Sequence, residues 1–65
     1  MKKISVSLSG HQTSICLEPE FIDELKKIAI RMKFSVSSII QDIDNNRRSD
    51  TNLCSAIRVW ILQHK

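Results

Sequence analysis

Residues 12–17 (QTSICL) place three short polar side chains two residues apart, with apolar or β-branched residues between them. In an extended chain, alternate residues point to opposite faces, so Gln12, Ser14 and Cys16 are expected to share one face. Their amide and hydroxyl groups donate and accept hydrogen bonds, whereas the thiol is only a weak donor. The pattern predicts either a face that forms hydrogen bonds with a partner or a strand face that only meets water.

The remaining chemical groups form no recognisable catalytic or metal-binding arrangement. Cys16, Cys54, His11 and His64 lack the close spacing of a zinc site such as CxxC. The acidic residues follow helix surfaces, and no Ser-His-Asp or Cys-His arrangement can be argued. A chain of 65 residues also has little room for a catalytic pocket. We therefore expect no enzyme activity, no metal and no cofactor.

The length limits how the chain can be stabilised. A single domain of 65 residues is marginally stable, and domains of this size usually depend on disulfides, a metal or oligomerisation. The start MKKISVSLSG lacks the apolar run of a signal peptide, and no run approaches the length of a membrane helix. We expect a cytoplasmic protein with reduced thiols, no membrane contact and oligomerisation as the stabilising device. The net charge of +3 permits a nucleic-acid partner without proving one.

Residues 4–17 are predicted to form a strand region. Two runs of residues alternate between inward and outward positions with the period of two that is typical of a half-buried strand. The inward positions are Ile4, Val6 and Leu8 in the first run and Thr13, Ile15 and Leu17 in the second. Gly10 separates the two runs. They form either a hairpin that turns near Gly10 or an N-terminal arm followed by one core strand. We favour the second run as the essential strand and the first as accessory.

Three amphipathic helices are expected after the strand region, at residues 19–33, 36–46 and 53–63. Pro19 suits the first turn of the first helix, and Ser35 is a good N-cap for the second. The polar segment 45–52 (NNRRSDTN) is typical of a loop. The apolar faces contain Phe21, Leu25, Ile28, Ala29 and Met32 in the first helix, Val36, Ile39, Ile40 and Ile43 in the second, and Leu53, Ala56, Ile57, Trp60 and Ile61 in the third.

These elements predict a single α+β domain, residues 1–65, that is mostly helical. One strand cannot satisfy its own edges, and an isolated two-stranded ribbon is marginal. A symmetric dimer solves both problems if the second strand pairs antiparallel with its copy and helices from both chains cover one face. The expected dimer core consists of Thr13, Ile15, Leu17, Phe21, Leu25, Ile28, Ile39, Ile40, Ile43 and Trp60.

Two segments, TSICLEPEFIDELKKIA and FSVSSIIQDI, resemble the ribbon-helix-helix family, which includes the Arc and MetJ repressors. The resemblance covers roughly residues 11–45. The helix start reads 17-LEPE-20, with its proline one place later than usual, while Ala29 and the opening 35-SVS-37 fall where the family has them. The segments LSGHQTSICLEPEF and NLCSAIRVWIL resemble a bacterial subgroup of short ribbon-helix-helix domain proteins.

The resemblance implies a ribbon-helix-helix fold with an extra C-terminal helix. It implies an intertwined homodimer whose intermolecular antiparallel β-ribbon enters the major groove of DNA. By this resemblance, Gln12, Ser14 and Cys16 contact base edges. Phosphates are contacted by the start of the second helix and by nearby lysines, that is by Ser35, Val36, Ser37, Lys2, Lys3 and Lys33. Ser35 and Ser37 are also explained by N-capping of the second helix alone.

The chain departs from the family at one position. Many members carry Arg or Lys on the outer face of the strand, where this chain has Gln12. The resemblance therefore implies a sequence-specific DNA-binding repressor, here with an uncharged base-reading face. The alternatives are a protein-interaction dimer that has kept the fold with weak or no DNA reading, and an antitoxin. The expected partners are a second copy and double-stranded DNA, and a second dimer or a protein partner stays open.

Overall fold

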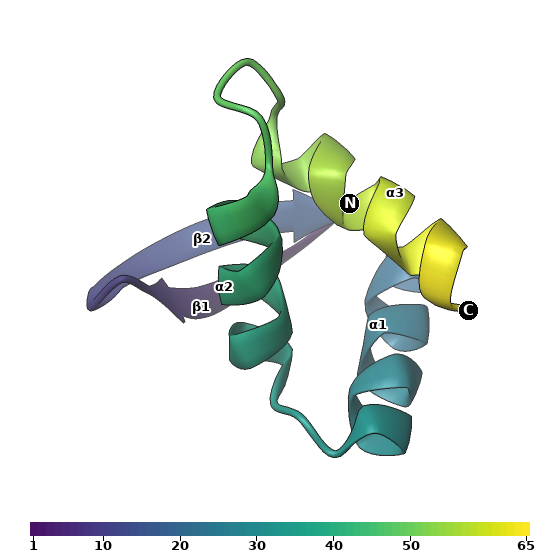
Figure 1. Cartoon of the computed structure of the whole chain (residues 1–65). Coiled ribbons are helices and arrows are strands. Elements are labelled where there is room, and N and C mark those ends of the chain that lie inside the picture. The colour runs from purple at the N-terminus through teal and green to yellow at the C-terminus, as the bar shows by residue number, and fades with distance from the viewer.

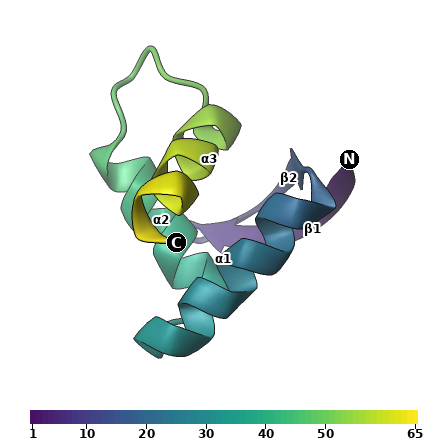
Figure 2. The ribbon, with the colours of Figure 1, turned by 90° about the vertical axis from the view of Figure 1, so that its right-hand side faces the viewer.

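The computed structural model describes all 65 residues as a β-hairpin followed by three helices (Figure 1). In chain order the elements are β1 (Lys2–Leu8), β2 (His11–Leu17), α1 (Pro19–Met32), α2 (Val36–Asn46) and α3 (Leu53–His64). The expected α+β, mostly helical fold with an extra C-terminal helix is confirmed. The helices lie on one side of the hairpin, and the loop between α2 and α3 projects from one end (Figures 1 and 2). None of the helices is long and apolar enough to cross a lipid bilayer.

The hairpin turns through two residues, Ser9 and Gly10. Their φ angles of 51° and 81° are both positive, as a type I′ turn requires, and this turn matches the natural twist of two strands. The strands pair antiparallel from Leu8 opposite His11 to Lys2 opposite Leu17. Of the two alternatives for the first run, the hairpin is therefore the one that the structure adopts.

The expectation that the first run is accessory was wrong. Val6 and Leu8 of β1 retain only 3% and 8% of their exposed area, so they belong to the core as much as Ile15 and Leu17 of β2. The hairpin is amphipathic because alternate side chains of both strands point inward. It buries this inner face against the helices and leaves the outer face open.

The core forms within one chain. Its buried side chains are Val6, Leu8, Ile15, Leu17, Ile22, Leu25, Ile28, Ala29, Ile39, Ile40, Ile43, Ile57 and Ile61. Of the residues expected in a dimer core, Thr13, Phe21 and Trp60 are only half-buried. Phe21 is displaced from the centre because α1 turns Ile22 inward instead, and its ring lies 5.9 Å from the Arg58 guanidinium carbon. Met32, expected on the same apolar face, is exposed where α1 ends.

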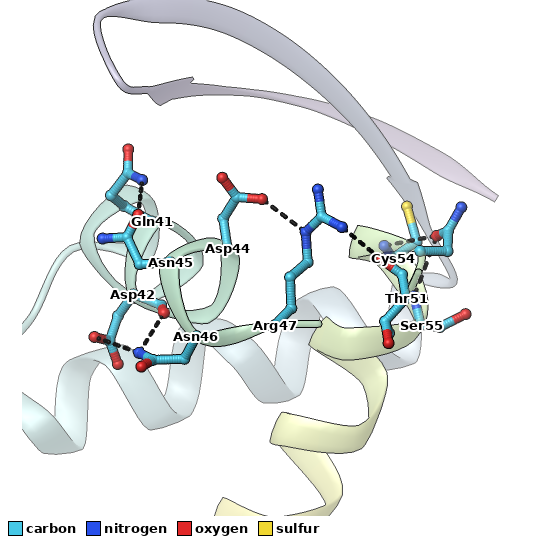
Figure 3. Close-up of polar contacts among 10 residues, drawn as sticks. Gln41, Asp42, Asp44, Asn45, Asn46, Arg47, Thr51, Cys54 and Ser55 are labelled. Atoms are coloured by element: carbon cyan, nitrogen blue, oxygen red, sulfur yellow. Dashed lines mark hydrogen bonds and ion pairs between the residues drawn. The ribbon is translucent and has the colours of Figure 1, made fainter. Parts of the chain in front are cut away.

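Polar contacts hold the loop between α2 and α3 (Figure 3). Arg47 donates from Nε to Oδ1 of Asp44 at 2.8 Å and from Nη1 to the carbonyl of Thr51 at 2.5 Å. Asn52 then caps α3, because its Oδ1 accepts hydrogen bonds from the backbone N–H groups of Cys54 and Ser55. Arg47 therefore stabilises the loop, and its guanidinium group forms its hydrogen bonds within the chain.

Helix α3 is joined to the start of α1 by an ion pair. Arg58 donates to both carboxylate oxygens of Glu18, from Nε at 2.9 Å and from Nη2 at 3.3 Å. Arg31 donates to the carbonyl of His64 near the other end of α3. These contacts fix the extra helix along α1, so that Ile57 and Ile61 can close the core.

Replacing Glu18 with glutamine is expected to remove an acid-sensitive part of the stability. The hydrogen bonds from Arg58 lower the pKa of Glu18 below its ordinary value of 4.5. A carboxyl whose pKa is lower in the folded state stabilises the fold above its unfolded pKa, and this contribution is lost as the pH falls through the folded pKa. We expect urea unfolding of the wild-type chain to weaken below about pH 4.5 more steeply than that of Glu18→Gln. Equal slopes for the two proteins would contradict this role.

Candidate nucleic-acid interface

The outer face of the hairpin carries two parallel rows of small polar side chains. The β2 row is Gln12, Ser14 and Cys16, and the β1 row is Ser7, Ser5 and Lys3. The rows are in register, with Ser7 opposite Gln12, Ser5 opposite Ser14 and Lys3 opposite Cys16. All six residues are exposed. The three residues predicted for base contacts therefore share one open face.

The β1 row was only partly identified from the sequence. Lys3 was predicted as a phosphate contact, whereas Ser5 and Ser7 were not singled out. The signal was present, since Ser5 and Ser7 alternate with Ile4, Val6 and Leu8 and must point away from them. An accessory first run would contribute no further contacts, and this expectation leaves Ser5 and Ser7 out of the predicted site.

The outer face is rich in hydrogen-bonding groups and carries little charge. Ser5 donates from Oγ to Oε1 of Gln12 at 3.0 Å, which fixes the carbonyl side of the amide and leaves the Nε2 group as a donor. The hydroxyls of Ser7 and Ser14 form no hydrogen bond within the chain. Lys3 is the only charged residue in the two rows. This face can recognise a surface by hydrogen bonds, but its own charge attracts polyanions only weakly.

The start of α2 offers two free backbone donors. Ser35 is the N-cap; its Oγ accepts from the backbone N–H of Ser38 at 3.0 Å and donates to Oγ of Ser38 at 2.9 Å. The N–H groups of Val36 and Ser37 have no acceptor in the chain, as expected for the first residues of a helix. Of the phosphate contacts predicted here, the two N–H groups stay available, whereas the Ser35 hydroxyl is engaged in capping.

Lys33 lies between α1 and α2 in a left-handed conformation, with φ 61° and ψ 37°. The backbone N–H of Lys33 donates to the carbonyl of Ile30, and that of Phe34 donates to the carbonyl of Ala29, so α1 ends in a Schellman motif. Glycine is usual at this place, because a side chain there costs about 1 kcal/mol. The chain instead keeps an exposed lysine two residues before the cap of α2.

The turn of the hairpin and one face of α2 border one polar hollow. Its lining residues are Ser7, Ser9, Gly10, Ser37, Ser38, Gln41, Asp42 and Asn45. The end of the outer face at Ser7 thus borders the same hollow as Ser37 at the start of α2. Lys2 lies at the opposite end of β1, where it pairs with Leu17. The structure therefore places Ser37 at the turn of the hairpin. Lys2 lies at the far end of β1, away from this hollow.

The hollow contains no basic side chain and one acidic one, Asp42. An anion at the start of α2 would be held by the N–H groups and the positive end of the helix dipole, which is worth about 0.3–1 kcal/mol at an exposed site. Positive charge would have to come from outside the hollow, from Lys33 or from the lysines of β1. Electrostatics alone therefore make this a weak anion site.

Comparison with known protein families identifies a match. A family model described as ribbon-helix-helix domain matches residues 1–65. No curated protein matches the chain, and no solved structure does.

Replacing Lys33 with glycine is expected to stabilise the fold. Glycine adopts a positive φ without steric cost, so the free energy of unfolding should rise by about 1 kcal/mol. Lys33→Ala is the matched control, because it removes the amino group but keeps the Cβ atom that causes the strain. Urea unfolding should show a gain for glycine only, and an equal gain for alanine would mean that side-chain charge, not backbone strain, is responsible.

Proposed function

Because this chain belongs to the ribbon-helix-helix domain family, whose members bind DNA as dimers, we propose that it is a homodimeric, sequence-specific DNA-binding protein and a transcriptional repressor. The observation that carries the proposal is the outer face of the hairpin. It is open, it is lined with hydrogen-bonding side chains, and its Ser7 end borders the same hollow as Ser37 at the start of α2. The proposed role is binding rather than catalysis, in the cytoplasm and without a cofactor.

The edge of β2 is the proposed dimer contact. A two-residue turn makes Leu8 and His11 a mutually hydrogen-bonded pair, so the backbone groups of alternate residues, Gln12, Ser14 and Cys16, point to the other edge of β2. No strand pairs with that edge within the chain. Proteins often protect an exposed edge with lysine or proline, and β2 has neither.

The edge of β1 differs, because Lys2 and Lys3 lie on that strand. Two β1 edges would bring like charges together, whereas two β2 edges would not. A second copy is therefore expected to pair antiparallel through β2 and to build a four-stranded sheet in the order β1, β2, β2 of the copy and β1 of the copy. This retains the expected contact between second strands and adds β1 on each side.

Such a sheet is wider than the major groove of DNA, and this limits which of its strands can enter the groove. Neighbouring strands lie about 4.8 Å apart, so the two outer strands are separated by about 14 Å, against a groove of about 12 Å. The two central rows would face the base edges, and the two outer rows would face the walls of the groove. This arrangement assigns base contacts to Gln12, Ser14 and Cys16.

Each proposed base contact has a chemical counterpart. The amide of Gln12 can pair with N6 and N7 of adenine, the hydroxyl of Ser14 can donate or accept, and Cys16 can pack against a thymine methyl group. No arginine reads guanine from this face. We therefore propose that sequence choice rests on hydrogen bonds and shape, and that most of the affinity comes from phosphates.

The phosphate contacts in this proposal come from three places. The outer rows contribute Lys3 and the hydroxyls of Ser5 and Ser7. The start of α2 contributes the backbone N–H groups of Val36 and Ser37. Lys2 and Lys33 add positive charge at the margins of the interface.

A protein-interaction module is the second candidate, and one surface favours it. Phe34 and Ile30 at the end of α1 are 57% and 79% exposed, and Val59 and Leu62 of α3 are also exposed. Phe34 also lines an apolar hollow, together with residues that include Met32, Ile39 and Trp60. Clustered exposed apolar side chains are typical of contact surfaces. This candidate predicts a protein partner and does not need the outer face of the hairpin.

When the purified protein selects genomic fragments at about 100 mM salt, we expect a short inverted repeat to be enriched. A salt titration should then show log K falling by about 0.9 for each neutralised phosphate. Gln12→Ala should relax the choice of sequence, whereas Lys3→Ala should weaken binding to all sequences alike and flatten the salt slope. Weak retention without sequence preference would favour the interaction module.

Replacing Ser14 with proline is expected to dissociate the dimer. The N–H of Ser14 points to the free edge of β2, so proline removes a hydrogen bond to the copy and none to β1. Ser5→Pro is the matched control, because Ser5 is opposite Ser14 and its N–H points to the outer edge of β1. Light scattering after gel filtration should give a monomer for Ser14→Pro and a dimer for Ser5→Pro. Two dimers would exclude the β2 edge as the contact.

A further inference from the structure

One side chain connects the turn of the hairpin to α2. The Oε1 atom of Gln41 accepts a hydrogen bond of 2.6 Å from the backbone N–H of Ser9, and its Nε2 group donates to Oδ1 of Asn45 at 2.9 Å. Figure 3 shows Gln41 and Asn45 side by side on α2. The contact between Gln41 and Ser9 is the only hydrogen bond between the hairpin and α2.

The other contacts between these elements do not fix a direction. The inner face of the hairpin meets α2 through buried apolar side chains, among them Leu8, Ile40 and Ile43. Burial of apolar area is non-directional, so it holds the elements together without choosing among small rotations. The covalent path is also indirect, because α1 lies between β2 and α2. A hydrogen bond, which weakens steeply with distance and angle, supplies the missing constraint.

Ser9 offers its N–H because of the turn itself. In a tight turn the N–H of the first central residue is not used by the hydrogen bonds between the strands. Ser9 is also held at φ 51°, a strained value for a residue other than glycine. Gln41 satisfies the free donor of this strained residue, and Asn45 orients the Gln41 amide so that its oxygen faces the turn.

We propose that Gln41 is a positioning residue that fixes the hairpin relative to the start of α2. The proposal rests on the proposed function, in which the outer face contacts bases while Val36 and Ser37 hold a phosphate. A phosphate held at α2 fixes the position of the DNA backbone. The angle of the hairpin then decides which base edges Gln12 and Ser14 reach. Gln41 would therefore control sequence preference without touching DNA bases.

The test compares three variants at α2. Gln41→Met keeps the length of the side chain and removes the acceptor, whereas Gln41→Glu keeps an acceptor oxygen. Asn46→Ala is the control for helix α2, because Asn46 bonds only to Asp42 on the same helix. Amide hydrogen exchange without DNA should accelerate at Ser9 in Gln41→Met, and not in Gln41→Glu or Asn46→Ala.

The second measurement is the ratio of dissociation constants for the selected duplex and a scrambled duplex. Gln41→Met should lower this preference about tenfold, with unchanged affinity for the scrambled duplex and an unchanged salt slope. Gln41→Glu should bind both duplexes more weakly, because of its charge, and should keep the preference. A merely structural role would change the two affinities together.

Three results would overturn the inference, and they differ in what else they exclude. If the wild-type protein prefers no duplex, the proposed function fails and the inference fails with it. If the wild-type protein prefers the selected duplex and Gln41→Met does so equally, only the positioning role is excluded. Unchanged exchange at Ser9 in Gln41→Met would exclude the contact itself.

Discussion

The register of the hairpin is the constraint on which the rest of the structure depends. The two-residue turn at Ser9 and Gly10 sets Leu8 opposite His11, and every later pair follows from it. A shift of one residue in β1 would turn Val6 and Leu8 outward and bury the serines between them. The same turn therefore decides both what enters the core and what the outer face offers.

Pairing within the chain changes the structural problem that a single strand would pose. With one strand, the inner face and both edges would need a second copy. With β1 in place, the chain closes its own core, and only one unprotected edge remains, that of β2. In the proposed dimer, pairing would therefore serve less to complete the core than to double the rows of the outer face. A symmetric pair of rows matches an inverted repeat in DNA, since each half-site would meet the same side chains.

Local patterns predicted most of the fold, and long-range contacts account for the rest. The second helix was placed at residues 36–46, as found, because Ser35 and the apolar spacing both mark its start. The burial of Ile22 rather than Phe21 is not marked by the spacing of apolar residues in α1, and the neighbour of Phe21 in the fold, Arg58, is far away in sequence. The shared face of Gln12, Ser14 and Cys16 followed from period two alone. The link between Gln41 and Ser9 spans 32 residues and has no sequence signal.

The strained backbone positions border the candidate interface rather than the core. The only residues other than glycine with positive φ are Ser9, at the tip of the hairpin, and Lys33, just before α2. Each is held by hydrogen bonds from its own backbone N–H, to Gln41 in one case and to the end of α1 in the other. Strain that glycine would relieve persists where surrounding contacts over-determine the conformation, and such positions gather at functional sites. The two positions flank the polar hollow and the free donors of α2. The hairpin turn and the Schellman end of α1 account for both conformations, so these positions fix the local geometry against which the proposed binding role is argued.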